Sequence, residues 1–557
     1  MTESGEGQRP PAGPTGVSVD WRSAAVREVA GAAADKLAAD GVPAALTAKD
    51  PGLWGPDAAA EAAIRLGWLD APRVSRALLG PLAELASEAR GAGLDHVVLC
   101  GMGGSSLAPE VISRTANVPL TVLDTTDPHA VRRALSDRLE ATLVVVSSKS
   151  GSTIETDSHR RIYEQAFAGL GLPAGEIARR FVMVTDPGSP LEATAREAGY
   201  HVMLADPNVG GRYSALTAFG LVPTALAGAD PARLLDEADA VLPALASPDG
   251  NPGLQLGAAL GGYALAGHDK AVLADCGSGL AGFADWAEQL IAESTGKHGR
   301  GILPVAVGGE DAPGFSPGPD LHLVGLGTPT SPADTSVTGP LGAAFLVWEY
   351  AIAVAGRLLE IDPFDQPNVA ESKENTARLL AEAGTGPLPA GEPAFSDGAV
   401  EVYAEPGQLP GAPADLAGAL DSLLQALPDR GYLAIMAYLD RDGDAGADAL
   451  RDALAGRTTH PVTFGWGPRF LHSTGQYHKG GPQNGVFLQI TGAVRADVPV
   501  PGRDFTLGRL QLAQALGDLG ALRQRSRPAV RLHLRDRAAG LRQVLDAARA
   551  SATGSVR

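Results

Sequence analysis

The sequence predicts an α/β fold built on parallel sheets with helical crossovers. Short apolar runs of strand length alternate with helix-like stretches, and most of these runs are apolar throughout, as expected for strands that are buried on both faces. The chain has 557 residues, of which 45% are hydrophobic and 20% are charged, so it holds ample apolar surface for a core. At roughly 150 residues per domain, this length suggests three to four domains.

The predicted elements follow in chain order. Residues 1–20 are polar and rich in Pro and Gly, and we expect them to form a disordered arm. Ala-rich or amphipathic stretches predict helices at 22–40, 57–66, 129–139, 231–246 and 341–359. Apolar runs predict strands at 95–100, 120–124, 142–148, 180–186, 270–275, 321–326, 400–404, 432–439 and 461–466.

These elements divide the chain into four predicted segments. A Gly/Pro-rich passage at 383–397 is a predicted linker. The predicted segments are an N-terminal arm with helices over 1–60, a first α/β domain over 61–225, a second over 226–382, and an additional α/β C-terminal segment over 398–557.

Composition excludes several function classes. The net charge of -19, without a basic stripe, argues against a nucleic-acid partner. Two cysteines and an N-terminus without an apolar signal core favour a reducing, cytoplasmic location. The most apolar window, 341–356, contains Glu349 and is expected to be too short to span a membrane. Because no CxxC, HExxH or similar ligand spacing is present, we expect no metal and no cofactor.

A glycine-rich loop follows the first predicted strand. Residues 101–106, GMGGSS, open a helix, where glycines let the backbone approach an anion and unpaired N–H groups can bind it. With Asp124 downstream, the loop is similar to a dinucleotide fingerprint, although Ser106 replaces its third glycine. The plain alternative is a tight strand-to-helix turn.

A second loop is rich in hydroxyl groups. Residues 147–153, SSKSGST, also lie between a predicted strand and a predicted helix. Hydroxyls, N–H groups and the Lys149 ammonium suit a single phosphate monoester, and the GxxxxGK[ST] pattern of a nucleotide-triphosphate loop is absent. The plain alternative is a capped helix with a solvated serine loop.

Four further polar clusters are candidates, each with a plain structural alternative. They are GGRYS at 210–214, Gln289 with ESTGK at 293–297, FDQP at 364–367 leading to Lys373, and HSTGQYHKGG at 472–481. Their respective alternatives are a surface turn, a solvated ion pair, an N-capped helix and a flexible loop.

Together and in order, these segments resemble the glucose-6-phosphate isomerase family. GMGGSS, SSKSGSTIET, GGRYS, QLIAESTGK and FDQPNVAESK resemble five of its motifs, over about residues 60–382, and HSTGQ resembles a sixth. The resemblance implies two sugar-isomerase domains, each a three-layer α/β/α sandwich with a parallel sheet. It also implies a homodimeric enzyme that acts on a small sugar phosphate.

The resemblance also implies roles for individual residues. Arg212 would stabilise an enediolate, and Glu293 would move a proton between C2 and C1 with Gln289 near the sugar. Lys373 would assist ring opening and help to hold the substrate. The implied phosphate cradle consists of Ser105, Ser148, Lys149, Ser150 and Thr153.

The sequence departs from the family at two points. Asn368 and Ala370 stand where the family has Gly and Glu, although Lys373 keeps its place. The family's histidine segment lies between its Glu and Lys motifs, whereas HSTGQ follows both here. Either His472 or His322 would open the sugar ring. We favour His472, because His322 lies inside an apolar strand pattern.

The residue types fit aldose–ketose isomerisation. One carboxylate can move a proton between adjacent carbons, a fixed arginine can stabilise the enediolate, and a histidine can shuttle the ring proton. Isomerisation of glucose 6-phosphate and fructose 6-phosphate is the predicted function, and additional action on mannose 6-phosphate is an alternative. A nicotinamide-dependent oxidoreductase and a non-catalytic sugar-phosphate sensor are alternatives from other classes.

Overall fold

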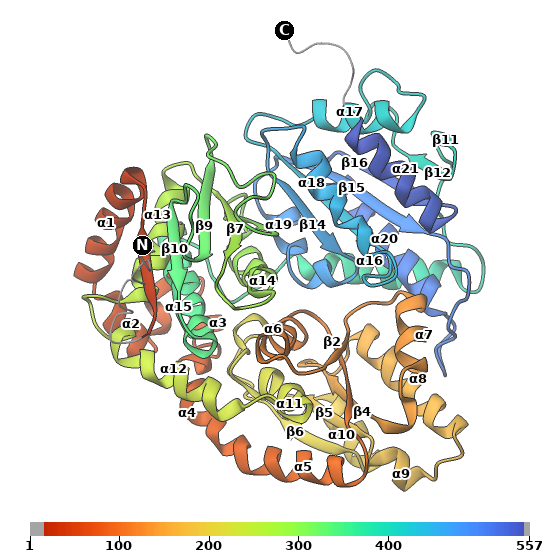
Figure 1. The fold of residues 1–557 in the computed structure, drawn as a ribbon, viewed down its shortest axis with the longest axis horizontal. Coiled ribbons are helices and arrows are strands. Elements are labelled where there is room, and N and C mark those ends of the chain that lie inside the picture. Colours follow the sequence, from red (N-terminus) through yellow and green to blue (C-terminus); the bar gives the residue numbers. More distant parts are fainter. Residues whose placement is uncertain (1–15, 551–557) are drawn as a thin grey trace, which may run out of the picture.

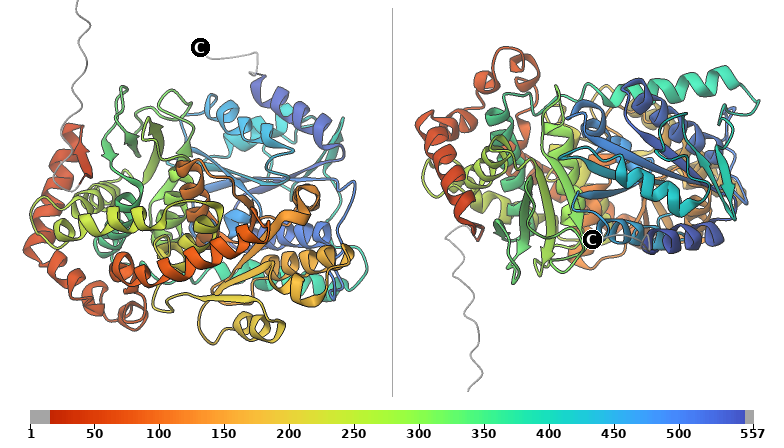
Figure 2. Two further views of the ribbon diagram at one scale, coloured as in Figure 1. Left: turned by 60° about the horizontal axis from the view of Figure 1, so that its bottom comes forward. Right: turned by 90° about the horizontal axis from the view of Figure 1, so that it is seen from above.

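A computed structural model describes residues 16–550, and across this range the chain forms three β-sheets, each flanked by helices (Figure 1). The second sheet lies on the left of Figure 1, the first at the lower right and the third at the upper right. Figure 2 shows that α1 (Ala24–Ala39) lies on the side of the molecule opposite to the third sheet. Residues 1–15 of the arm predicted over 1–20 lie outside the described residues.

The first sheet has the strand order β3-β2-β4-β5-β6, and all four pairings are parallel. Its central strands are apolar and buried on both faces because helices cover both sides. The strands are β2 (His96–Gly101), β3 (Thr121–Leu123), β4 (Thr142–Ser147), β5 (Phe181–Thr185) and β6 (His201–Leu204). The helices are α5 (Leu79–Gly91), α6 (Leu107–Ala116), α7 (Pro128–Ser136), α8 (Ile154–Gly169), α9 (Ala174–Ala178), α10 (Pro190–Ala198) and α11 (Ala218–Ala227).

The second sheet has the order β1-β10-β9-β7-β8, in which β1 is antiparallel and the other pairings are parallel. The strands are β1 (Ser18–Trp21), β7 (Lys270–Cys276), β8 (Leu303–Val307), β9 (Leu321–Gly327) and β10 (Thr335–Thr338). The other helices of this part are α2 (Val42–Thr47), α3 (Ala59–Ala62), α4 (Ala71–Val74), α12 (Pro231–Leu245), α13 (Pro252–Leu265), α14 (Phe283–Thr295) and α15 (Leu341–Leu359).

The third sheet has the order β11-β12-β16-β15-β13-β14, in which the β11–β12 and β12–β16 pairings are antiparallel and the other three pairings are parallel. The strands are β11 (Phe395–Asp397), β12 (Val400–Tyr403), β13 (Tyr432–Tyr438), β14 (Val462–Trp466), β15 (Gly485–Gly492) and β16 (Ala529–Leu534). The helices are α16 (Val369–Ala383), α17 (Leu416–Gln425), α18 (Ala449–Ala455), α19 (Gly475–Gly480), α20 (Leu507–Gln524) and α21 (Arg537–Arg549).

Short 3₁₀ helices complete the described secondary structure. They are η1 (Pro51–Trp54), η2 (Gly67–Asp70), η3 (Ser75–Leu78), η4 (Gly103–Ser105), η5 (Leu139–Ala141), η6 (Gly211–Tyr213), η7 (Ala445–Ala447) and η8 (Arg469–His472). Three of them, η4, η6 and η8, carry residues from the motifs identified in the sequence.

The predicted α/β class with parallel sheets and an α/β C-terminal segment is confirmed. The nine predicted strands are all present, whereas seven others have no counterpart in the prediction. Residues 18–20 were expected to be disordered, but they belong to β1, which hydrogen-bonds to β10 and extends the second sheet. Residues 395–397 of the predicted linker form β11.

Helix α15 has the predicted range of 341–359. Among the described residues it is the one helix that is long and apolar enough to cross a membrane, so the expectation that the window is too short is wrong. However, 89% of its apolar window is buried inside the protein, where it packs between α12, α13 and α14. This is the environment of a core helix.

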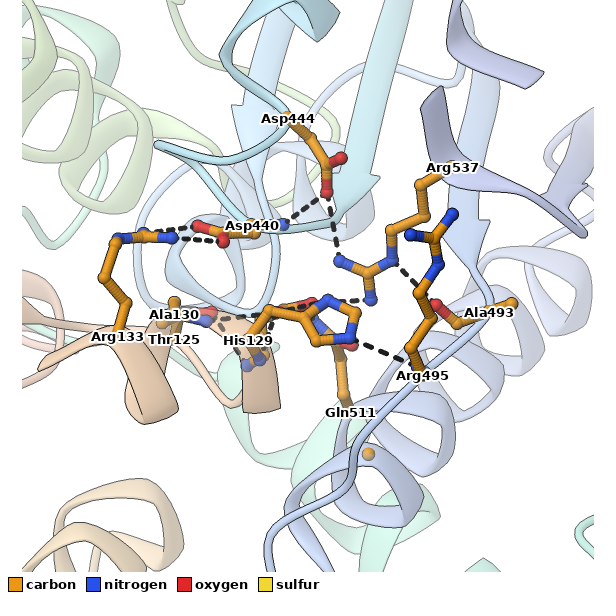
Figure 3. Close-up of polar contacts among 12 residues, drawn as sticks. Thr125, His129, Ala130, Arg133, Asp440, Asp444, Ala493, Arg495, Gln511 and Arg537 are labelled. Carbon is orange, nitrogen blue, oxygen red and sulfur yellow. Dashed lines mark hydrogen bonds and ion pairs between the residues drawn. The ribbon is translucent and has the colours of Figure 1, made fainter. Parts of the chain in front are cut away.

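Polar contacts join the first and third sheet regions. Helix α7, which follows β3, faces the loops after β13 and β15 and the start of α21 (Figure 3). Arg537 is 7% exposed and forms ion pairs with Asp127 at 2.8 Å and with Asp444 at 3.0 Å. Arg133 pairs with Asp440 at 2.6 Å. These contacts hold the C-terminal segment against the first sheet region, which carries the hydroxyl-rich loop.

Candidate active site

Glycines bring four of the motifs into contact. A Cβ atom at Gly104 would lie 1.9 Å from the carbonyl oxygen of Gly211. Gly103 has a φ of +55°, and a Cβ atom there would lie 2.8 Å from Gln289 Nε2 and 2.9 Å from His472 O. The GMGGSS loop therefore needs its glycines because it packs directly against three other segments of the site.

The hydroxyl-rich loop lies where the sequence predicts it, between β4 and α8. Ser148 is buried, and its Oγ lies 2.9 Å from Thr153 Oγ1 and accepts a hydrogen bond from the Gly151 N–H. Ser150 is exposed and contacts the Ser152 hydroxyl at 3.0 Å. Hydroxyl groups and the N-terminus of α8 thus converge, as a phosphate site requires.

The Lys149 ammonium has a partner of its own. It forms an ion pair with Asp186 at 2.5 Å and lies 3.4 Å from the Pro207 carbonyl oxygen. Burial raises the pKa of Asp186, and Lys149 opposes that shift. The positive charge of Lys149 is therefore partly neutralised by Asp186. Ser105, the remaining residue of the expected cradle, is buried in η4 beside the loop that carries Arg212.

Helix α14 presents Gln289 and Glu293 one turn apart. Both side chains are buried, with 4% and 8% of their surface exposed. Gln289 Nε2 donates to Glu293 Oε2 at 3.0 Å and to the His472 carbonyl oxygen at 2.8 Å. Gln289 thereby links the carboxylate of α14 to the C-terminal HSTGQ segment.

Arg212 is buried beside this carboxylate. Its Nη1 lies 3.8 Å from Glu293 Oε1 and donates to Gln366 Oε1 at 2.8 Å. Its Nε donates to Ser294 Oγ, and its Nη2 donates to the carbonyl oxygens of Pro363 and Asp365. These contacts fix the guanidinium plane, so its charge faces Glu293 without reorganisation.

His472 lies beside Glu155 from the first sheet region. His472 Nε2 donates to Glu155 Oε1 at 3.2 Å, and within residues 16–550 the other ring nitrogen, Nδ1, has no hydrogen-bonding partner. Burial alone would raise the pKa of Glu155. The charge that His472 carries when protonated, its hydrogen bond and the charge of Lys373 together outweigh burial and lower that pKa to about 2. Glu155 is thus ionised at neutral pH.

His322 has a different environment. It is 1% exposed in β9, bonds through Nε2 to Thr335 Oγ1 at 2.8 Å, and packs edge-on against Tyr263. Burial lowers its pKa. This is the environment of a satisfied core histidine, and it favours His472 as the functional one.

The HSTGQ segment reaches the other motifs although it follows them in sequence. Gln476 Nε2 donates to Gly296 O and to Asn368 Oδ1, each at 2.9 Å, and Gln476 Oε1 accepts from the Asn368 N–H at 2.9 Å. Asn368 is one of the two departures from the family pattern. It therefore makes two hydrogen bonds to Gln476, one through its side chain and one through its backbone N–H. Lys373 lies on α16, is exposed, and acts on Glu155 through its charge.

Several site residues were missed in the sequence. Glu155 and Gln366 stood inside recognised motifs, so their place in the motif was a signal that could have identified them. Lys297 is fully buried and pairs with Asp365 at 2.5 Å, while burial and the nearby Arg212 lower its pKa to about 8. Gln514 gave no signal, because it lies outside every motif.

The interpretation of GMGGSS as a dinucleotide-binding loop requires Asp124 to bind a ribose hydroxyl. Asp124 is 4% exposed, accepts a hydrogen bond from Ser106 Oγ at 3.2 Å and pairs with Arg469 at 3.1 Å. A carboxylate with these partners is not free to bind a ribose hydroxyl. Among the described residues, no group of three or more His, Cys, Asp or Glu side chains is arranged to hold a metal ion.

The arrangement can carry out proton transfer next to a bound anion. A buried carboxylate, Glu293, lies beside a fixed arginine, and Gln289 connects this carboxylate to the backbone of a histidine whose Nδ1 has no hydrogen-bonding partner within residues 16–550. The hydroxyl-rich loop ends two residues before Glu155, the partner of this histidine. A proton could therefore move on one part of a ligand while another part is held by the loop.

Comparisons with known proteins identify relatives of this chain. The phosphoglucose isomerase family model matches residues 86–299. The glucose-6-phosphate isomerase of Symbiobacterium thermophilum is 30% identical over 398 residues, covering 57% of this chain and 87% of that protein. The probable glucose-6-phosphate isomerase of Haloarcula marismortui is 33% identical over 259 residues, covering 44% of this chain and 58% of that protein.

Solved structures share the fold. A hypothetical protein from Thermus thermophilus matches with a TM-score of 0.54 at 23% identity, covering 66% of this chain and 100% of that one. A glucose-6-phosphate isomerase from Chlamydia trachomatis matches with a TM-score of 0.52 at 19% identity, covering 66% and 89%.

Proposed function

Because the chain belongs to the glucose-6-phosphate isomerase family, we propose that it interconverts D-glucose 6-phosphate and D-fructose 6-phosphate through an enediolate. The observation that carries this proposal is the link through Gln289, whose amide bonds to both Glu293 and the backbone of His472. This link joins a buried base to a histidine from a distant part of the chain.

Glu293 is the proposed base of the isomerisation. Its carboxylate takes the proton from C2 of the open-chain aldose and returns it to C1, which requires it to lie within about 3 Å of both carbons. The Arg212 guanidinium, 3.8 Å from this carboxylate, stabilises the negative oxygen that develops on the enediolate. Gln289 and the fixed bonds of Arg212 hold both groups before the substrate arrives.

His472 is the proposed ring-opening residue. Because Nε2–H donates to the Glu155 carboxylate, the imidazole is held as the tautomer whose Nδ1 can accept a proton. Nδ1 takes the proton from the O1 hydroxyl as the C1–O5 bond breaks, and the same proton then goes to O5. Lys373, whose charge already acts on Glu155, assists the developing negative charge on the ring oxygen.

The loop at 148–153 is the proposed phosphate site. Ser105, Ser148, Ser150 and Thr153, with the N–H groups at the start of α8, would donate to the phosphate oxygens. Lys149 would add a charge weakened by Asp186. Phosphate binding far from the reacting carbons fixes the orientation of the sugar, which can lower the barrier by several kcal/mol.

The remaining assignments follow from the family. We propose 1–60, 61–225, 226–382 and 398–557 as segment limits, with 61–225 and 226–382 as the two sugar-isomerase domains. A cytoplasmic homodimer is the proposed biological form. Since Glu293, Arg212 and His472 all belong to one chain, we expect the activity per subunit to be independent of protein concentration. Sedimentation gives the oligomeric state at each concentration, and the activity measured at the same concentrations tests this expectation.

The test of the function is conversion of fructose 6-phosphate to glucose 6-phosphate by the purified full chain, with EDTA and without added metal. Turnover is expected under these conditions, and its absence would overturn the proposal. Mannose 6-phosphate in a parallel assay tests the wider substrate range. A rise in NADH fluorescence on mixing, together with no isomerisation, would favour an oxidoreductase.

A further inference from the structure

Gln514 connects the C-terminal segment to the carboxylate that holds His472. It lies on α20, is 3% exposed, and donates from Nε2 to Glu155 Oε1 at 2.7 Å. Its Oε1 accepts a hydrogen bond from Thr126 Oγ1 at 2.7 Å. Glu155 Oε1 is also the oxygen that accepts from His472 Nε2. One carboxylate oxygen therefore receives both the amide and the imidazole.

The chemistry of these groups decides which way the amide points. An ionised carboxylate only accepts hydrogen bonds, so the NH₂ group of Gln514 must face Glu155. The amide oxygen then faces Thr126, whose hydroxyl donates to it. Thr126 is fully buried in the loop between β3 and α7, so this oxygen has a fixed donor.

We propose that Gln514, anchored by Thr126, is a positioning residue that fixes the Glu155 carboxylate and through it the tautomer and plane of the His472 ring. This inference rests on the proposed function. The Gln514 amide donates a hydrogen bond to Glu155 in addition to the one from His472, and it acts through Glu155 and not by contact with the sugar. Its role is to keep Oε1 in the one position where it accepts Nε2–H and leaves Nδ1 free.

Loss of the amide should slow ring opening in particular. A hydrogen bond to a buried charged group is strong, and leaving the carboxylate with one donor fewer allows it to turn away from His472. We expect Gln514→Leu to lower kcat on cyclic glucose 6-phosphate by about 10- to 100-fold with KM changed less than about threefold. Proton abstraction by Glu293 should be unaffected.

A matched control is available one turn away. Gln511 lies on the same helix and is also buried, but its Nε2 donates to Asp127 Oδ2 at 3.2 Å and not to Glu155. Gln511→Leu removes the same amide from the same interface and should leave kcat within about threefold of the wild-type value. Thr126→Val should give a smaller loss than Gln514→Leu, and Thr126→Ser, which keeps the hydroxyl, should restore turnover.

The experiment compares these variants on glucose 6-phosphate and on the same sugar deuterated at C2. If ring opening becomes the slow step, the deuterium isotope effect on kcat falls toward 1 in Gln514→Leu but not in Gln511→Leu. Loss of folded protein lowers the rates on the ordinary and the deuterated sugar by the same factor, so the isotope effect does not change. If the wild-type isotope effect is already near 1, the kcat comparison with Gln511→Leu decides.

Either of two results would overturn this inference while leaving the proposed function standing. One is equal kcat in the Gln514→Leu and Gln511→Leu variants, and the other is a loss of kcat with an unchanged isotope effect above 1. If Gln514→Leu does not fold, the Thr126→Val and Thr126→Ser pair is measured in the same way and decides. A wild-type protein without isomerase activity would overturn the proposed function, and this inference with it.

Discussion

His472 Nε2 lies 3.2 Å from Glu155 Oε1, although 317 positions separate the two residues. The histidine comes from the C-terminal segment and the glutamate from the first turn of α8 in the first sheet region. Docking of the C-terminal segment is thus part of building the site, since without it Glu155 loses His472 and Gln514, and Gln289 loses its bond to the His472 carbonyl oxygen.

Glu293→Gln should remove the proton-transferring group while keeping the shape of the site. We expect kcat to fall by about 10²- to 10⁴-fold, because the amide cannot accept the C2 proton. Binding of fructose 6-phosphate, measured by calorimetry, should change little since the phosphate loop is intact. Near-normal kcat in this variant would remove Glu293 from the mechanism. Retained binding without any wild-type turnover would favour a sensor.

His472→Ala and His322→Ala separate the two candidate histidines. Turnover of cyclic glucose 6-phosphate should fall by about 10²-fold or more in His472→Ala, because the ring proton loses its carrier. His322→Ala should lower stability, since it leaves Thr335 without its bonding partner in the core, but kcat per folded molecule should stay near the wild-type value. If only His322→Ala slows turnover, the assignment to His472 is wrong.

Thr153→Ala and Lys149→Ala test the phosphate loop. Each substitution should raise KM with little change in kcat, because the phosphate is held equally in the bound substrate and in the transition state. The effect of Thr153→Ala should be the larger, because Lys149 already pairs with Asp186. Ser152→Ala, which removes an exposed hydroxyl of the same loop, serves as the comparison. A large fall in kcat without a change in KM in Thr153→Ala would contradict the assignment.

The sequence predicted the central strands best. β2, β4 and β5 are short, continuously apolar and buried on both faces, so their pattern alone identifies them. β15 was not predicted, although it is buried and follows the glycine-bounded segment at 472–481. β1 could not be recognised, since a four-residue edge strand exists only through its pairing with β10.

The site was predictable where its residues lie in contiguous motifs. Ser148, Arg212 and Glu293 each lie beside glycines or hydroxyls within a few positions, and such local clusters are visible in one sequence. Gln514 and Thr126 could not be found in this way. Their role depends on the docking of α20 against the loop after β3, and a long-range contact leaves no local signal.

Glu155→Gln should change the pH dependence of stability. The folded protein holds the pKa of this carboxyl at about 2, below its ordinary value of 4.5. The unfolded chain therefore binds the proton more tightly, so Glu155 stabilises the fold fully above about pH 4.5 and progressively less as pH falls toward 2. The difference in unfolding free energy between the wild type and the variant, up to about 3 kcal/mol, should shrink as the pH falls from about 4.5 toward 2.

Urea unfolding at several pH values measures this difference. Glu176→Gln, which removes an exposed carboxylate paired with Arg179, controls for the loss of one negative charge. A difference that stays constant or grows as pH falls would show that the Glu155 carboxyl is not held in its ionised form by the fold.

Arg537→Gln should loosen the docking of the C-terminal segment. The Arg537 guanidinium pairs with the buried carboxylate of Asp127 and with the partly buried carboxylate of Asp444. Its Nε donates to the Ala493 carbonyl oxygen at 2.9 Å, and Figure 3 shows Arg537 between Asp444 and Ala493. Removing one partner of a buried pair leaves an uncompensated charge, which typically costs about 3–5 kcal/mol. Arg495→Ala in the same view removes an exposed pair with Asp536 and should cost less than about 1 kcal/mol. Because His472 belongs to the segment that Arg537 holds, kcat should fall together with the urea midpoint in Arg537→Gln, and equal urea midpoints in the two variants would contradict this role.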